Sequence, residues 1–392
     1  MYKQKHFLKG LSRRIRQSSW RTRLNFVTFG LIVVVLILAR HELVQAWYLL
    51  GRVNLWILLL LIPVQFASYY ASAEIFFSYL KQRGQLKRTN TLQATGMSLE
   101  LNFVNHVFPS GGVSGASYMV WRLGKLGVTA GQGIMAQVMR YVVQMGTFMV
   151  LLALALAWAT LSNRTASWVV VATAIGITSL VFVVLFGGYL VGSQARMKTF
   201  AHWLTGVVNA AVQKVTFGRR SEILRADRAE KFFLDFHRDF MVLKNDKKLL
   251  LKPIIWSFLF DLFEVLLFVI SFWALGEWVN PAALLIAYGA ATLTGTFMLT
   301  PGGAGAYEAV MIGILSASGV AAGVAFAGVI VARAILIIGT LASGFVVYQH
   351  ALRKYGRPNL QKKIDLAPEG EIESAERTDV EQEPIKDEKA DE

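Results

Sequence analysis

Apolar stretches long enough to cross a lipid bilayer recur along this 392-residue chain and limit the folds open to it. In hydrocarbon every backbone N–H and C=O group needs an internal partner, so an apolar run of about 18 residues predicts a transmembrane helix. Six stretches predict such helices: 24–39, 55–80, 134–161, 168–191, 254–275 and 323–348. The chain is therefore predicted to be an all-α, polytopic membrane protein.

Two further apolar regions, 91–121 and 281–319, are interrupted by Pro and Gly residues. Each has room for two short helices but little for two full spans, at a rise of about 1.5 Å per residue. Irregular backbone at membrane depth is tolerated only where protein or a watery cavity surrounds it. We therefore predict two Gly-rich re-entrant helical hairpins. A pair of ordinary kinked spans is the alternative for each.

The formal net charge of +15 is placed where a membrane protein carries it. Residues 1–23 hold eight Lys and Arg residues and no acid, directly ahead of the first apolar stretch. Such a flank indicates a cytoplasmic N-terminus, and anionic headgroups add to the preference. A cleaved signal peptide is the less favoured alternative. No recognition motif accompanies the charge, so we expect no nucleic-acid partner.

The other basic clusters fall on the same side as the N-terminus, which predicts a cytoplasmic C-terminus as well. Loop 194–252 carries thirteen Lys and Arg residues against six acids. Apolar residues at helical spacing from Phe232 to Leu243 predict a helix there that either lies on the membrane surface or docks against the bundle. The predicted domains are a basic N-terminus at 1–23, a membrane domain at 24–350 and an acidic, disordered tail at 357–392.

Residues that would carry catalysis or bind a metal are sparse. The chain has no cysteine, and its six histidines form no ligand-spaced pair. No nucleophile motif occurs, and no soluble region is large enough to host an active site. We therefore expect neither an enzyme nor a bound cofactor or metal.

A weak internal repeat relates region 55–161 to region 254–350 at an offset of about 191 residues. Both regions show, in the same order, an intramembrane Glu, a Gly-Gly pair, an Arg, and a Gly-Thr pair six and seven residues after the Arg. The first set is Glu74, Gly111-Gly112, Arg140 and Gly146-Thr147, and the second is Glu264, Gly302-Gly303, Arg333 and Gly339-Thr340. The predicted topology inverts the second half, as in many secondary transporters, which bind substrate between broken helices at the repeat interface.

Charged residues inside the predicted helices are the main site candidates, because a charge in the bilayer costs at least about 2.5–3.5 kcal/mol on insertion scales. A guanidinium at Arg140 or Arg333 is suited to phosphate. The alternative is that the arginines pair with Glu74, Asp261, Glu264 or Glu308 and only stabilise the bundle. The acids in turn either pair structurally or carry a coupling proton.

The Gly-rich motifs complete the candidate site. Residues 301–308 read Pro-Gly-Gly-Ala-Gly-Ala-Tyr-Glu, which permits one helix to end and another to begin with Glu308 in its first turn. A structural capping role for Glu308 is the alternative. The predicted substrate-binding residues are Arg140, Arg333, Glu74, Glu264, Asn105, Pro109, Gly111, Gly112, Pro301, Gly302, Gly303, Gly305, Tyr307 and Glu308.

The motif at 301–308, with Asn-x-x-x-Pro-x-Gly-Gly at 105–112, resembles the flippase-like membrane region of lysylphosphatidylglycerol synthases over roughly residues 20–350. The resemblance implies a region that moves aminoacylated phospholipid across the cytoplasmic membrane. Only an acidic tail follows Arg357, where the full synthase has an aminoacyl-transferase domain. Ser114-Gly115 replace an acidic residue common after the first Gly motif. Lipid aminoacylation is therefore not implied.

The leading hypothesis is a translocator of a phospholipid or lipid-linked anion in the cytoplasmic membrane of a bacterium or archaeon. The rival is a non-transporting scaffold or accessory subunit of a lipid-modifying or glycan-assembling enzyme. A membrane transferase with Glu308 as its base is a third hypothesis. The expected partners are membrane lipids with an anionic headgroup, and a homo-oligomer or a transferase partner is also considered.

Overall fold

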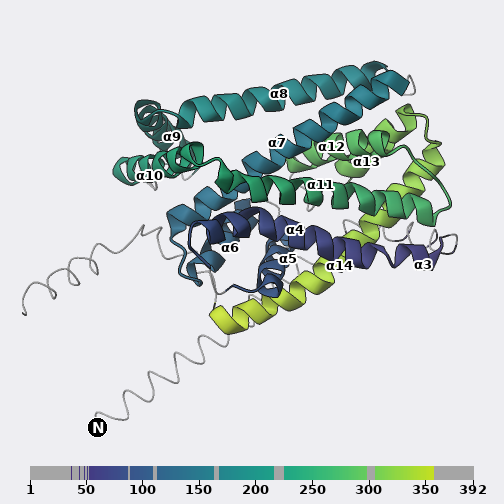
Figure 1. The fold of residues 1–392 in the computed structure, drawn as a ribbon, viewed down its shortest axis with the longest axis horizontal. Coiled ribbons are helices and arrows are strands. Elements are labelled where there is room, and N and C mark those ends of the chain that lie inside the picture. The colour runs from purple at the N-terminus through teal and green to yellow at the C-terminus, as the bar shows by residue number, and fades with distance from the viewer. Residues whose placement is uncertain are drawn as a thin grey trace, which may run out of the picture. The chain divides into compact units, whose positions relative to one another are not determined.

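The structure is a computed structural model that describes residues 37, 44, 48, 51, 53–86, 89–108, 113–162, 167–215, 225–297 and 305–356. Every regular element within these ranges is an α-helix (Figure 1). The predicted basic N-terminus at 1–23 and acidic tail at 357–392 lie outside the described residues, as does the predicted first span at 24–39 apart from Ile37.

Five described helices are long and apolar enough to cross a membrane. They cover Leu55–Gln82, Ala130–Trp158, Thr173–Val191, Lys248–Ala274 and Ala322–Tyr355. These are five of the six predicted spans, and the prediction of an all-helical, multi-pass chain is confirmed for the part of the chain that the structure describes. A helix satisfies its own backbone groups, which is why apolar runs of this length adopt it.

The first group of helices runs from residue 55 to residue 162. It consists of α3 (Leu55–Leu58), α4 (Leu61–Gln82), α5 (Thr91–Val107), α6 (Val113–Gly124) and α7 (Ala130–Ser162). Asparagines begin two of them. The Asn54 side chain accepts a hydrogen bond from the backbone N–H of Trp56 at 3.0 Å, and Asn90 accepts one from Leu92 at 2.7 Å.

The second group follows the same order. It consists of α11 (Lys248–Ala274), α12 (Pro281–Phe297), α13 (Ala306–Ala317) and α14 (Ala322–Tyr355). Helices α5 and α12 both have 17 residues, α6 and α13 both have 12, and α7 and α14 have 33 and 34. Each broken segment is thus a pair of short helices, as expected. Their re-entry into one face of a membrane stays a prediction.

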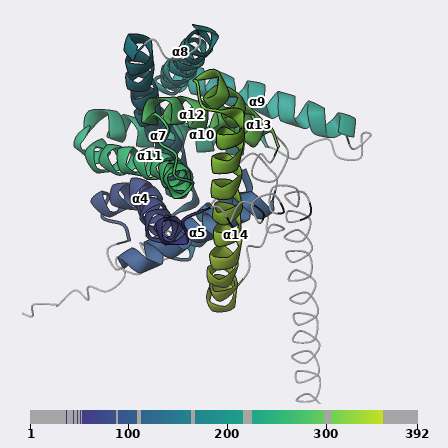
Figure 2. The ribbon, with the colours of Figure 1, turned by 90° about the vertical axis from the view of Figure 1, so that its right-hand side faces the viewer.

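The two groups interlock. Helix α4 packs along α11, α14 packs against α5, and α7 packs against both α11 and α12 (Figure 2). The close approaches depend on glycine: a Cβ at Gly344 of α14 would lie 2.6 Å from the Cβ of Phe103, and one at Gly289 of α12 would lie 2.8 Å from the Phe148 ring. The long last helix of each group therefore contributes to the core of the other group.

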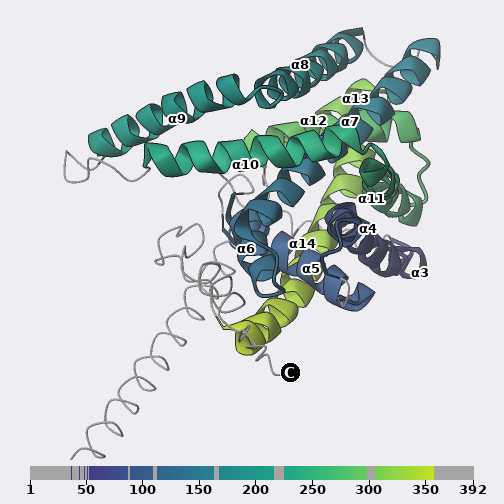
Figure 3. The ribbon, with the colours of Figure 1, turned by 60° about the vertical axis from the view of Figure 1, so that its left-hand side comes forward.

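Helices α8 (Ser167–Val191), α9 (Gln194–Val215) and α10 (Ala226–Asn245) lie between the two groups in sequence and follow α7 along one side of the structure (Figure 3). The apolar face of α10 is docked, with Leu243, Phe236 and Phe240 packed into the core around α4, α5 and α7. The sequence left docking and a membrane-surface position open for this helix, and the observed contacts favour docking.

Candidate functional site

Buried charges in membrane-length helices are unusual, because each costs several kcal/mol to remove from water unless a partner compensates it. In this chain Glu74, Arg140, Asp261, Glu308 and Arg333 are at most 9% exposed. The partner that each one has, or does not have, decides what it can do.

Arg333 of α14 has an acidic partner. Its Nε donates a 2.6 Å hydrogen bond to Oε1 of Glu308, while Oε2 of Glu308 accepts a 2.7 Å hydrogen bond from the backbone N–H of Gly305. The guanidinium also lies 4.2 Å from the centre of the Tyr307 ring. Gly305 has φ = 88°, a left-handed conformation that glycine adopts without strain. The second Gly motif therefore places Glu308 to neutralise Arg333, and Glu264 lies within electrostatic range as well.

Arg140 of α7 has no such partner. Its side-chain Nε and Nη1 are fully buried and make no hydrogen bond with any described residue. None of the ion pairs among the described residues includes it. Two aromatic rings lie nearby, with centres 6.0 Å (Phe76) and 5.5 Å (Tyr141) from the guanidinium carbon. A buried guanidinium without a counter-charge is strongly unfavourable, which makes Arg140 the group most in need of a ligand.

Gln137 lies one helical turn before Arg140 on the same face of α7, and the sequence-based prediction missed it. The residue is 3% exposed, and both its amide nitrogen and its amide oxygen are buried without a partner among the described residues. One signal could have revealed it: Gln137, Arg140, Gln144 and Thr147 follow one another at intervals of three and four residues. They form a polar stripe on an otherwise apolar helix.

The stripe continues to a hydrogen-bonded contact with the second group. The Thr147 hydroxyl lies 2.6 Å from the hydroxyl of Ser257 and donates to Asp261 at 3.1 Å, both on α11. Thr340 occupies the corresponding position seven residues after Arg333, and its hydroxyl bonds the phenol of Tyr69 on α4. In each group the threonine of the Gly-Thr pair thus contacts the first long helix of the other group.

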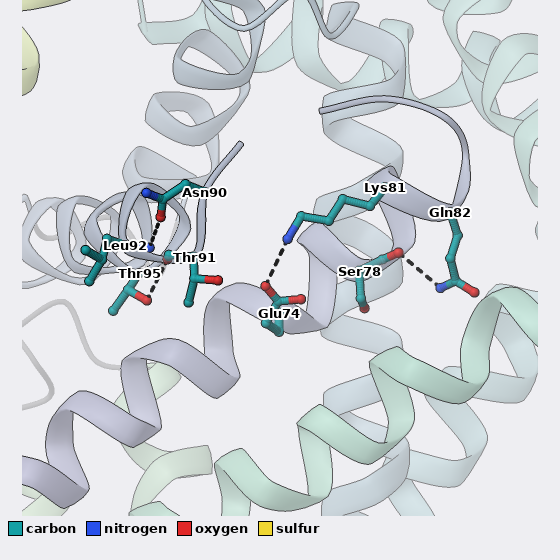
Figure 4. A network of polar contacts seen from close by, with 8 residues as sticks. All are labelled: Glu74, Ser78, Lys81, Gln82, Asn90, Thr91, Leu92 and Thr95. Atoms are coloured by element: carbon teal, nitrogen blue, oxygen red, sulfur yellow. Dashed lines mark hydrogen bonds and ion pairs between the residues drawn. The ribbon is translucent and has the colours of Figure 1, made fainter. Parts of the chain in front are cut away.

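The two predicted glutamates have different partners. Glu264 accepts a hydrogen bond from the hydroxyl of Ser68 on α4. Glu74 forms an ion pair with Lys81 of its own helix at 3.2 Å, and Figure 4 shows the Lys81 amine reaching back along α4 to the Glu74 carboxylate, beside the first turn of α5. Neither glutamate pairs with an arginine of the described residues at ion-pair distance.

Asn105 closes the first hairpin. Its side-chain oxygen accepts a 3.0 Å hydrogen bond from the backbone N–H of Gly115, and a Cβ at Gly115 would collide with that oxygen. A substrate-binding role for Asn105 stays a prediction. Six other predicted site residues lie outside the described residues: Pro109, Gly111, Gly112, Pro301, Gly302 and Gly303.

A second buried ion pair was not predicted. Arg122 of α6 donates from Nε to Glu100 of α5 at 3.1 Å, and the Tyr118 hydroxyl donates to the same carboxylate oxygen at 2.8 Å. The guanidinium stacks 3.9 Å from the Tyr355 ring of α14. The Arg122 side chain is 4% exposed, so the pair lies inside the protein. The pair joins both helices of the first hairpin to α14.

Of the predicted site residues that the structure describes, Gly305, Tyr307, Glu308 and Arg333 form one contact set. Arg140 is outside this set, and Glu74, Glu264 and Asn105 each have other partners. Residues 25–344 match the family model described as the lysylphosphatidylglycerol synthase TM region. The chain belongs to this family. Comparison with curated proteins and with solved structures finds no match. Membership confirms the resemblance and, with the apolar helices, a multi-pass membrane domain associated with lipid modification or transport.

Proposed function

We propose that the protein is a translocator of a phospholipid or lipid-linked anion across the cytoplasmic membrane of a bacterium or archaeon. The observation that carries the proposal is the buried guanidinium of Arg140, which lies on a membrane-length helix and whose Nε and Nη1 have no partner among the described residues. A phosphate-bearing headgroup needs a compensated path through hydrocarbon, and a preorganised guanidinium compensates its charge and binds its oxygens. Lipid modification and transport are also the context of the family.

The short helices of the two groups have the same lengths, which supports an internal repeat. The contacts of Thr147 with α11 and of Thr340 with α4 support it further. With both termini in the cytoplasm, the basic loops place the second half upside down relative to the first. Inverted halves with broken helices give a central site access to each membrane face in turn. On this proposal α5–α6 and α12–α13 are re-entrant hairpins that open the Arg140 region alternately.

The proposal assigns different tasks to the two arginines. Arg333 already has its negative charge in Glu308, so its task is to hold α13 against α14. Arg140 binds the substrate anion. Glu264 and Asp261 of α11, bonded to hydroxyls rather than to cations, are the groups available to balance charge or carry a proton as the headgroup passes.

The test is lipid movement by purified protein in sealed proteoliposomes, with tail-labelled anionic, zwitterionic and cationic phospholipids. Arg140→Ala is compared with Arg225→Ala, which removes an arginine from an exposed ion pair with Asp227. Headgroup-selective movement that is lost only in Arg140→Ala supports the proposal. Equal movement by wild type and Arg140→Ala overturns it. No movement of any lipid by folded protein favours the non-transporting scaffold instead.

The transferase hypothesis is less well supported by the site. Both carboxylate oxygens of Glu308 already accept hydrogen bonds, one of them from an arginine. A general base needs a free lone pair directed at its substrate, so this arrangement does not favour Glu308 as a base.

A further inference from the structure

Four buried polar atoms on one turn of α7 have no hydrogen-bond partner among the residues that the structure describes. They are Nε and Nη1 of Arg140 and the amide nitrogen and oxygen of Gln137. The two side chains are three residues apart and so lie side by side on the helix surface. Three of the atoms belong to donor groups and one is an acceptor. A ligand that satisfies all four must offer several acceptors and one donor.

Apolar side chains surround this turn: Phe76, Met135, Met139 and Val143 belong to the same cluster. On the helices that pack against α7, no described acid forms an ion pair with Arg140. Glu74, Asp239, Glu230 and Asp227 pair with other cations, and Asp261 and Glu264 bond to the hydroxyls of Thr147 and Ser68. The positive charge of Arg140 is therefore left for a ligand, and a ligand of net charge −1 neutralises it.

We propose that Gln137 and Arg140 form a binding site for a phosphodiester that carries a neutral, hydroxylated headgroup. The Nε–Nη1 fork of Arg140 binds two non-bridging phosphate oxygens. The Gln137 amide nitrogen donates to a further phosphate or ester oxygen, and its amide oxygen accepts from a headgroup hydroxyl. This inference deepens the proposed function, on which it rests, by stating the class of headgroup.

Other headgroups fit the same four atoms less well. An ammonium in place of the hydroxyl also donates to Gln137, but it leaves one positive charge uncompensated among apolar side chains. A diphosphate brings at least one negative charge in excess. A bare phosphate offers the acceptors without carrying a lipid, so it must be distinguished experimentally from a phospholipid.

Lipid binding is measured separately from transport, by native mass spectrometry of the full-length protein in detergent. The phospholipids compared carry the same acyl chains and differ only in the headgroup. The probes are a glycerol-headgroup phosphodiester of charge −1, an ethanolamine-headgroup zwitterion and inorganic phosphate. We expect the glycerol lipid to bind about tenfold or more tightly than the zwitterion, because the ammonium of the zwitterion leaves one positive charge uncompensated among apolar side chains. Equal binding of the two lipids overturns the inference. If inorganic phosphate binds as tightly as the glycerol lipid, the site binds free phosphate and the proposal that its ligand is a phospholipid is overturned.

Gln137→Glu is the decisive variant. A carboxylate one turn from Arg140 supplies the missing counter-charge from within the protein, so lipid affinity should fall at least about tenfold while the fold is kept. Gln93→Glu makes the same chemical change on α5, where Gln93 donates to Tyr355, and should bind as wild type. Wild-type binding by Gln137→Glu overturns the inference.

A further variant and a second assay separate the possible failures. If Gln137→Glu does not fold, Gln137→Leu replaces it. This variant keeps the Arg140 charge but removes the amide donor and acceptor, so its affinity for the glycerol lipid should fall about tenfold while the preference over the zwitterion is kept. Wild-type affinity for the glycerol lipid overturns the inference. Selective binding without transport supports this site and overturns the translocator. Transport that depends on Arg140 but not on the headgroup overturns the inference about the headgroup and still supports the proposed translocator function.

Discussion

The two helix groups use the same scaffold for opposite electrostatic purposes. Both have two short helices of 17 and 12 residues, then a long helix whose arginine precedes a cross-group threonine by seven residues. In the second group Glu308 neutralises that arginine, whereas in the first group no described acid does. With the Gly-Gly pairs aligned, Ser117 stands where the second group has Glu308. On the proposed function, the absence of this carboxylate in the first group leaves Arg140 available to a ligand, whereas Arg333 has a structural role.

The largest expected effect tests this contrast through stability. Glu308→Ala leaves Arg333 buried without its carboxylate, and removing one partner of a buried ion pair costs about 3–5 kcal/mol of unfolding free energy. Arg140→Met removes a charge that has no ion-pair partner among the described residues and should be neutral or stabilising. Unfolding of both variants in detergent is the measurement. Similar losses in the two variants would show that the arginines are equivalent after all.

The second effect concerns the hairpins. A Cβ at Gly115 would collide with the side-chain amide of Asn105, so Gly115→Ala should displace that amide, break its hydrogen bond with the Gly115 N–H and destabilise the protein by about 1–3 kcal/mol. Gly313→Ala in α13 places its Cβ in open space and should leave the unfolding free energy almost unchanged. Equal stability of the two variants would contradict the close packing of the first hairpin.

The third effect tests the reciprocal contacts directly. Thr147→Val and Thr340→Val each remove one hydroxyl that joins the two groups, and each should cost about 0.5–1.5 kcal/mol. Similar losses, measured by unfolding in the same detergent, sharpen the comparison, because they show that the groups exchange equivalent contacts. A loss confined to Thr147→Val would indicate that only the contact to Asp261 matters.

The smallest effect lies outside both groups. Glu230 of α10 accepts hydrogen bonds from Lys198 and His202 of α9, and the bond from Lys198 is the main cause that lowers its pKa below the ordinary 4.5. A lowered carboxyl pKa stabilises the folded state above pH 4.5, and this stabilisation is lost as pH falls through the folded-state pKa. The protection factors of the α9 and α10 amides, which correct for the intrinsic pH dependence of exchange, should therefore fall slightly below pH 4.5, and Glu230→Gln should remove that step. An unchanged pH dependence in the variant would exclude Glu230 as its source.

Much of the architecture could be predicted, because apolar length and helix breaks are local properties of the sequence. Five spans and both short-helix pairs follow from them. The partner of Arg333 could not be chosen among Glu74, Asp261, Glu264 and Glu308. That choice depends on how α13 turns at Gly305, which is a tertiary property. Gln137 was missed for a related reason: an amide in an apolar helix is informative only once its neighbours are known to offer no partner.

The interlocking of the two groups has a consequence for biogenesis. Helix α5 is covered by α14, which the ribosome completes roughly 250 residues later. At about 5–20 residues per second, α5 stays without its final neighbour for on the order of ten to fifty seconds of synthesis. During that interval the first half sits in the bilayer with its Glu100–Arg122 pair lacking the Tyr355 ring that stacks on it. The newly inserted chain therefore matures only after its last helix arrives, and a nascent chain stalled before α14 is the form most exposed to membrane quality-control proteases.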